Sequence, residues 1–192
     1  MPALILAAAT AAALPTPAPA SLAEALPREA AGFVRGSATD FATRPGGEAG
    51  LGIGVEYRPV TGAAGVATVY LYDRRRADLP PGAESPAVRA ELDTAQREIE
   101  TLGPDRGYRI AARWAIAPLV GLDGVPALSC LRMVLAYISG LQADSFACVG
   151  VVQGRFVKLR MTLPAAQDGS AEQQLREFGV AVVTAAERAP SG

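Results

Sequence analysis

Residues 128–162 read LSCLRMVLAYISGLQADSFACVGVVQGRFVKLRMT, and this stretch decides the fold. Its large apolar residues recur at alternate positions, a period that is typical of β-strands. Gln153-Gly154 lies between two apolar runs and suits a two-residue hairpin turn, because glycine adopts positive φ without a steric penalty. The stretch therefore predicts three consecutive antiparallel strands.

The turn at Gln153-Gly154 sets the register of the last two strands. It gives these facing pairs: Val152 with Arg155, Gly150 with Val157, Cys148 with Leu159 and Phe146 with Met161. If residues 139–144 form the preceding loop, Tyr137 faces Phe146 and Leu135 faces Cys148, so the large apolar residues of all three strands share one face. The predicted core combines that face with two helices: Leu131, Met133, Leu135, Phe146, Val157, Leu159 and Met161 with Leu92, Ile99, Leu175 and Phe178.

The opposite face of the three strands is half apolar and carries three cations. Arg132, Lys158 and Arg160 are expected there beside Phe156. A cationic, half-apolar face suits a partner protein or a small amphipathic anion. The alternative is that helices cover the apolar part while the charged ends reach water or neighbouring carboxylates. The predicted helix over 86–102 offers three such carboxylates: Glu91, Glu98 and Glu100.

The other elements are predicted from periodicity and from terminal signals. Alternation predicts strands over 51–57, 67–72 and 108–116. Ser85 as N-cap and Pro86 as the first helical residue begin the helix over 86–102, which Gly103-Pro104 should end. A capping box of Ser170 and Gln173 begins a second helix over 170–187. The order predicts a single-domain α+β fold, an antiparallel sheet with helices packed on it.

This order of elements resembles the PsbP/Mog1-like α/β/α sandwich. The stretches that carry the resemblance are ATVYLYD at 67–73 and GRFVKLRMT at 154–162, followed by the helix from Ser170. The resemblance covers most of residues 51–188 and is architectural. It implies an α/β/α sandwich-like arrangement and a non-catalytic accessory or binding protein, without naming a partner.

The N-terminus resembles a secretory signal peptide. Residues 3–14 form an uncharged apolar run that is too short to span a bilayer, and Ala18-Pro19-Ala20 is a small-x-small cleavage site. We expect cleavage before Ser21, export to a periplasm or beyond, and no transmembrane anchor in the mature form. The alternative is a disordered Ala/Pro tail. The predicted boundaries are a signal peptide at 1–20, a partly flexible segment at 21–50, the α+β domain at 51–188 and a tail at 189–192.

Export and register disagree about the two cysteines. An oxidising compartment favours a disulfide between Cys130 and Cys148. The register above places them on different faces, several residues out of step. A cross-strand disulfide would need a tighter turn around Ser139, which would set Arg132 opposite Phe146 and break the shared apolar face. We therefore expect two unpaired thiols, with Cys148 as a small core residue.

Composition argues against several chemistries. The chain of 192 residues has a net charge of −1, which gives no reason to expect nucleic acid as a partner. It has no histidine, so neither a transition-metal site nor a cofactor is expected, and the glycines at 50–54 lack the spacing of a nucleotide-binding loop. No catalytic residue is predicted. An exported binding module is the first hypothesis, and a hydrolase-like enzyme with a Ser–Lys pair or a carboxylate is the alternative.

Overall fold

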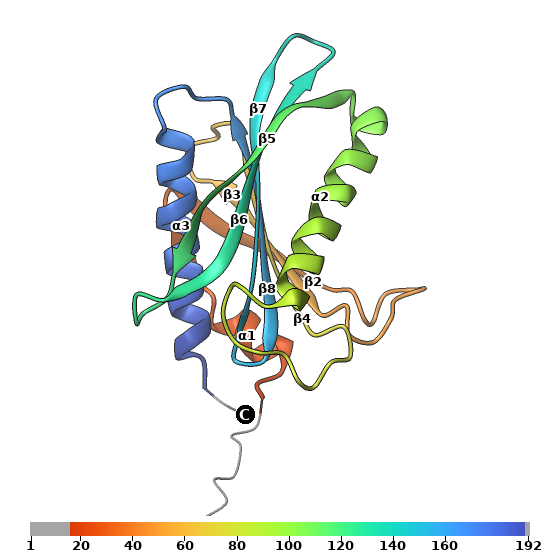
Figure 1. Cartoon of the computed structure of the whole chain (residues 1–192), viewed down its shortest axis with the longest axis vertical. Helices are drawn as coiled ribbons and strands as arrows, with labels where there is room; N and C mark the ends of the chain where they lie inside the picture. Colours follow the sequence, from red (N-terminus) through yellow and green to blue (C-terminus); the bar gives the residue numbers. More distant parts are fainter. Residues whose placement is uncertain (1–15, 191–192) are drawn as a thin grey trace, which may run out of the picture.

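The computed structural model describes residues 16–190, which form one antiparallel sheet of eight strands and three helices (Figure 1). Across the sheet the strands follow the order β1-β2-β3-β4-β8-β7-β6-β5. The strands are β1 (Glu29–Ala30), β2 (Phe33–Asp40), β3 (Ile53–Pro59), β4 (Val66–Tyr72), β5 (Tyr108–Val120), β6 (Pro126–Tyr137), β7 (Gln142–Val152) and β8 (Arg155–Pro164). The helices are α1 (Pro19–Ala25), α2 (Pro86–Arg106) and α3 (Ser170–Arg188).

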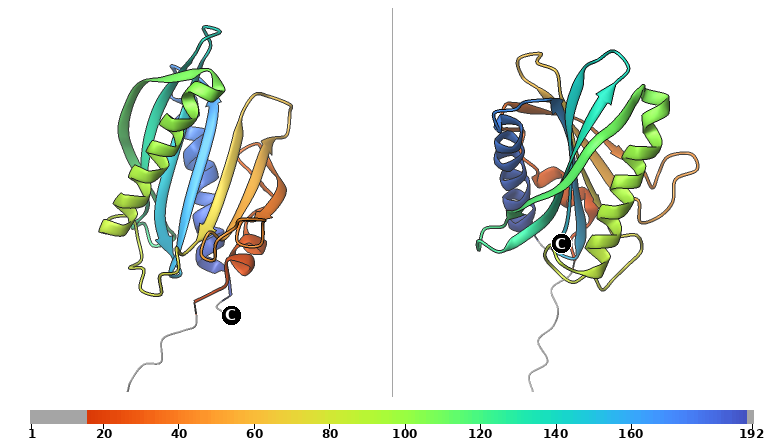
Figure 2. Two further views of the ribbon diagram at one scale, coloured as in Figure 1. Left: turned by 90° about the vertical axis from the view of Figure 1, so that its right-hand side faces the viewer. Right: turned by 45° about the horizontal axis from the view of Figure 1, so that its top comes forward.

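The helices lie on the two sides of the sheet (Figure 2). α1 and α3 pack on the side that carries Val69, Cys148 and Leu159, which we call the α3 face. α2 packs on the side that carries Tyr70, Val149 and Lys158, which we call the α2 face. α2 lies mainly over β5, β6 and β7 and also packs on Tyr70 and Tyr72 of β4, so it leaves much of the β2–β4 half of the α2 face uncovered.

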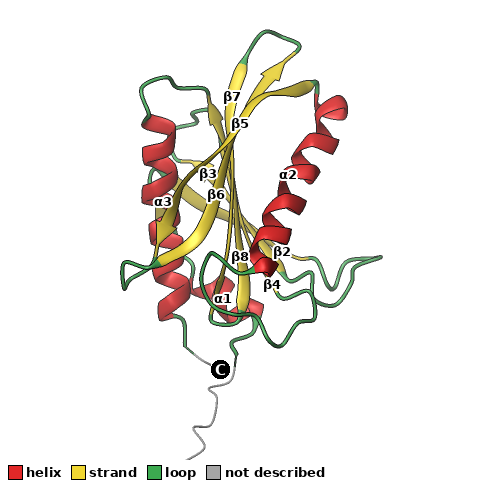
Figure 3. Cartoon of the chain, viewed as in Figure 1, coloured by secondary structure: helices red, strands yellow, loops and turns green. Residues whose placement is uncertain are grey.

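The expected α/β/α sandwich-like fold is wrong. The structure is mostly antiparallel sheet, with 41% of residues in strands and 27% in helices, and the sheet curls into a half-barrel (Figure 3). Residues 29–40, which composition assigned to a partly flexible segment, form β1 and β2 and widen the sheet. Because strands twist, a sheet this wide curls, and three helices cover only parts of it.

The hairpin of β7 and β8 is confirmed. Gln153 and Gly154 form its turn with φ angles of 49° and 71°. The facing pairs are the expected ones, from Val152 opposite Arg155 to Phe146 opposite Met161. The positive φ of Gly154 is the conformation that the Gln-Gly pair predicts.

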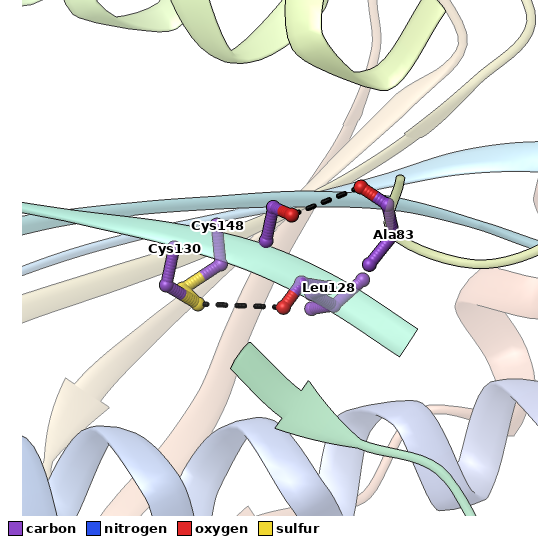
Figure 4. The surroundings of a disulfide bond; sticks show 5 residues. Ala83, Leu128, Cys130 and Cys148 are labelled. Atoms are coloured by element: carbon purple, nitrogen blue, oxygen red, sulfur yellow. Dashed lines mark hydrogen bonds between the residues drawn. A yellow bond between two sulfur atoms is a disulfide. The ribbon is translucent and has the colours of Figure 1, made fainter. Parts of the chain in front are cut away.

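The register of β6 differs from the prediction, and with it the prediction of two unpaired thiols is wrong. The turn is tight around Ser139, so Arg132 rather than Tyr137 faces Phe146, a shift of five residues. Cys130 then lies directly opposite Cys148 and forms a disulfide with it (Figure 4). The shift was expected to break the single apolar face. The single face is indeed broken, and α2 covers the apolar residues of the second face.

The predicted single core is therefore divided between the two faces, because an odd shift exchanges the sides of a strand. Phe146, Leu159 and Met161 pack with Leu175 and Phe178 on the α3 face. The predicted core residues of β6 pack instead with α2, in a cluster on the α2 face that holds Leu131, Met133, Leu135, Leu92 and Ile99.

The predicted signal peptide falls mostly on residues 1–15, which lie outside the described part of the chain. Within it, Pro19 and Ala20 begin α1, whose Leu22 is fully buried in the core of the α3 face. Within residues 16–190, no helix is both long enough and apolar enough to cross a bilayer.

Candidate functional site

The structure brings together three of the four predicted surface residues. Phe156, Lys158 and Arg160 alternate along β8 on the α2 face. Arg132 lies on the α3 face, because the shifted register of β6 turns it to the other side of the sheet. The prediction that all three cations share one face is wrong for Arg132.

Arg132 belongs to a part-buried ion network on the α3 face. Its guanidinium donates to Asp144 at 2.8 Å and to Glu172 at 3.0 Å, and it stacks between the rings of Trp114 and Phe146. Burial works to lower the pKa of Arg132, but the hydrogen bonds to the two carboxylates outweigh it and raise the pKa. Through these hydrogen bonds Arg132 joins β6 to β7 and α3. Its guanidinium donors are occupied, so Arg132 does not form an open site.

Phe156 and Arg160 have unequal exposure. Phe156 is buried between Tyr72 and the apolar residues of α2, and its ring lies 5.3 Å from that of Tyr72. Arg160 is half-buried further along β8 and has no ion pair among the described residues. Phe156 is thus part of the core, and Arg160 remains on the surface of the sheet.

Lys158 is the only lysine of the chain and is 6% exposed. Its Nζ donates to Glu98 of α2 at 3.1 Å. The same ammonium lies 4.9 Å from the ring centre of Tyr70 and 5.6 Å from that of Tyr72, within the range of cation–π attraction. The alternative in which a carboxylate of 86–102 neutralises a cation is therefore confirmed for Lys158.

A second ionic group stands beside Lys158. The Tyr72 hydroxyl donates to Glu91 at 2.8 Å, and Glu91 also binds Arg74 at 3.1 Å. Burial, then the charge and hydrogen bond of Glu91, raise the pKa of Tyr72 well above its usual range. Glu91 thus joins Tyr72 of β4 and Arg74 of the following loop to α2.

These side chains line a hollow of about 280 Å³ on the α2 face. Tyr70 and Lys158 lie on the sheet, α2 contributes Glu98, and the chain between β2 and β3 contributes Phe41 and Leu51. The full lining is Phe41, Leu51, Tyr70, Tyr72, Arg74, Glu98 and Lys158. The hollow thus lies between a helix and a loop, over the half of the sheet that α2 leaves uncovered.

Phe41 lies close over the sheet because its ring stacks on Tyr70 and because Gly54 below it has no side chain. Its ring stacks on Tyr70 with a centre distance of 6.1 Å. A Cβ at Gly54 would lie 2.7 Å from the Phe41 ring, so only glycine allows the ring to approach β3 this closely. Arg44 lies over the other part of the Phe41 ring at 5.6 Å and places a further cation at the rim.

Sequence reasoning found Lys158 but missed most of its surroundings. The alternation over 67–72 places Tyr70 and Tyr72 on one side of β4, and the pairing of β4 with β8 sets Tyr70 opposite Lys158. That pairing joins distant parts of the chain, so no local pattern reveals it. Phe41 comes from a segment without strand or helix periodicity, and nothing in the sequence marks it.

The predicted Ser–Lys pair of the alternative hypothesis is not found in the described chain. The hydroxyl of Ser129 donates to the carbonyl of Ala83, and that of Ser145 pairs with Thr162. The hollow beside Lys158 has no serine in its lining. Residues 16–190 also contain no group of three His, Cys, Asp or Glu side chains placed to hold a metal ion.

Comparison with known proteins gives no family for this chain. A scan against protein-family models and a search of curated proteins both return no match. The resemblance to the PsbP/Mog1-like family remains a prediction, and the site must be interpreted from its own residues.

Proposed function

We propose that the protein is an exported binding module and that the hollow beside Lys158 binds a small aromatic anion. One observation carries the proposal: a buried lysine ammonium lies against two tyrosine rings in a hollow that opens on an uncovered part of the sheet. A concave site with a few converging polar groups is typical of ligand binding.

The hollow takes an anion by exchange at Lys158. Lys158 and Arg74 line it, and in the ligand-free structure Lys158 is paired with Glu98 and Arg74 with Glu91. The Glu98 side chain is 40% exposed, so it can turn to water when a ligand carboxylate or sulfonate takes its place at Lys158. Because the ligand anion replaces Glu98 at Lys158, the gain is the difference between two ion pairs and not the roughly 4 kcal/mol of one pair at about 4 Å.

The rings of the hollow favour a flat apolar body on that anion. Phe41 and Tyr70 are stacked on each other, and each is partly exposed. Offset or edge-on contacts with such rings contribute about 0.5–1.5 kcal/mol beyond the area buried. A hollow of about 280 Å³ is at the lower end of small-molecule sites, so the ligand has one or two rings.

The hydrolase-like alternative has less support. Lys158 is bonded to Glu98, and Ser129 and Ser145 are bonded to other residues. Export is supported by the Cys130–Cys148 disulfide, which suits an oxidising compartment.

Titration calorimetry with naphthalene-2-sulfonate, and with naphthalene-2-methanol as its neutral counterpart, tests the proposal. We expect the sulfonate to bind at least about tenfold more tightly, the effect of roughly 1.4 kcal/mol from its charge. Lys158→Met should weaken the sulfonate about tenfold or more, because it keeps the length of the side chain and removes the charge. Glu98→Gln should strengthen it several-fold, since the competing carboxylate is gone.

Arg160→Met is the matched control. It removes a cation from the same face of β8 outside the hollow, and it should leave sulfonate affinity unchanged. The proposal fails if Lys158→Met and Glu98→Gln change thermal stability but bind both probes with the affinity of the unsubstituted protein. The Lys158–Glu98 pair would then have only a structural role.

A further inference from the structure

The outer edge of β5 is long and exposed. β5 spans 13 residues and ends the sheet, so its outer backbone groups face no other strand of the described chain. The residues at 111–115 are all exposed, and Trp114, the only tryptophan of the chain, is 40% exposed. Unpaired N–H and C=O groups along such an edge are a template for a further strand.

The opposite edge of the sheet does not offer the same template. β1 has only two residues, and short edge strands resist pairing with another chain. β5 pairs with β6 without interruption over residues 112–116 and is irregular between Ile110 and Ala112 and after Ile116, so residues 112–116 are its regular template. A contact between copies therefore joins β5 to β5, and such a like-to-like contact closes as a two-fold dimer rather than a filament.

The sequence of β5 is self-complementary about Trp114. Arg113 and Ala115 face the α2 side of the sheet with Met133 and Leu131, whereas Ala112, Trp114 and Ile116 face the α3 side. An antiparallel copy centred on Trp114 sets Arg113 opposite the second Ala115 and Ala112 opposite the second Ile116. Each side chain then meets one from its own face of the sheet, as continuous pairing requires.

The charges agree with this register. Centring the pair one residue earlier would set the two copies of Arg113 against each other, which is unfavourable. In the register about Trp114 each Arg113 faces an alanine, and its charge is already paired with Glu100 of α2. The two Trp114 rings become cross-strand neighbours, an arrangement that contributes to sheet stability.

A hollow beside the edge provides room for the second copy. It measures about 530 Å³ and is lined by residues 108–113 of β5 with Glu100 and Pro104 of α2. In the register about Trp114, the part of the second β5 that follows Trp114 passes along this hollow. We propose that two copies of the protein associate through their β5 edges, antiparallel about Trp114, so that the two sheets become one.

Sedimentation equilibrium and tryptophan fluorescence, measured over the same concentration range on the full chain, test the association. We expect a monomer–dimer equilibrium and, over the same range, a blue shift of the emission and slower quenching by acrylamide. Trp114 is the only source of the signal and lies at the proposed two-fold axis. A protein that remains monomeric up to millimolar concentration overturns the proposal.

Two substitutions at one exposed position test the register. In the dimer, Ala115→Glu places a carboxylate opposite Arg113 of the other copy at two symmetric positions. It should lower the dimer dissociation constant about tenfold. Ala115→Arg places like charges there and should raise it by a similar factor. Ala64→Glu, in the exposed loop between β3 and β4, is the control for added charge and should leave it unchanged.

The opposing directions distinguish the proposed pairing from its alternatives. If Glu and Arg at position 115 shift the equilibrium equally, the copies do not meet in this register and the proposal is overturned. The protein could instead stay monomeric and show protection of Trp114 from quenching only when an unrelated extended peptide is added. The β5 edge would then pair with foreign strands, and this result also overturns the proposal.

Discussion

Gln153 connects the β7–β8 turn to the end of α3. Its Nε2 lies 2.9 Å from each of the carbonyl oxygens of Ala186, Glu187 and Ala189, so its two hydrogens are shared among three acceptors. The last carbonyls of a helix have no partner within the helix, so this side chain serves as their cap. The benefit comes with a constraint, because Gln153 has a φ of 49°, which non-glycine residues rarely adopt.

Substitutions at Gln153 separate these two effects. Gln153→Ala loses the cap and keeps the unfavourable φ, and it should reduce the free energy of unfolding by about 1–3 kcal/mol. Gln153→Gly loses the cap but relieves the φ, so its loss should be smaller by roughly 0.5–1 kcal/mol. Chemical denaturation of both variants measures the difference.

Gln173→Ala serves as the reference for Gln153. Its amide bonds only to Glu177 on the exposed side of α3, so its loss should stay within about 0.5 kcal/mol. A Gln153→Ala variant as stable as the unsubstituted protein would show that these hydrogen bonds contribute nothing.

The predicted signal-peptide cleavage would remove the first residues of α1. Cleavage before Ser21 removes Pro19 and Ala20, and it also removes the Pro17 carbonyl that accepts from Arg155 at 2.9 Å. It leaves Leu22 and Leu26, both buried in the core of the α3 face. We expect the exported product to begin at Ser21 by intact-mass analysis and to remain folded, because the core contacts of α1 are kept.

Leu22→Ala in the processed protein tests that explanation. The loss should be about 2–5 kcal/mol if Leu22 packs as described. A product that keeps residues 1–20, or a Leu22→Ala variant with unchanged unfolding, would contradict the prediction.

Elements were predictable from sequence where the signal is local. Ser85 caps α2 by accepting from Val88, as predicted. Two local predictions were wrong: α2 continues through Gly103-Pro104 to Arg106, and α3 begins after Gly169 without the Ser170 capping box. Proline ends a helix only if its ring clashes with the turn before it, and the last turn of α2 accommodates Pro104.

The register of β6 and the residues of the hollow beside Lys158 depend on pairing between strands that are distant in the sequence. The apolar pattern of β6 fits either of two registers, because both faces of the sheet are buried at β6–β8 and neither face requires the large residues. The hollow could be predicted only at Lys158. Its other residues lie on β4, α2 and the chain after β2, and these meet only through the sheet order β4-β8.

The whole molecule should lose stability at alkaline pH through its tyrosines. Burial, opposed in part by Arg35, raises the pKa of Tyr57 to about 12, and burial first of all also raises the pKa of Tyr72 and Tyr108. Each of these groups ionises at higher pH in the folded than in the unfolded chain. Their contribution is therefore full below about pH 10 and falls as the pH rises towards the folded values.

Absorbance at 295 nm against pH measures this effect. Folded protein should lag behind the guanidinium-unfolded chain, and chemical denaturation should give a lower free energy of unfolding at pH 11.5 than at pH 9. Tyr57→Phe loses the hydrogen bond to the Pro27 carbonyl at every pH but should show a smaller decline between those values. Identical titration curves for folded and unfolded chains would refute the prediction.

The disulfide selects between two ways of assembling the same strands. Before Cys130 and Cys148 are oxidised, β6 can align with β7 either in the observed register or in the one that gathers its large apolar residues with those of β7 and β8. Oxidation is possible only in the observed alignment, since the other separates the sulfurs. Formation of the disulfide therefore fixes the observed alignment, whereas a chain aligned in the other register keeps both thiols and can still re-pair its strands.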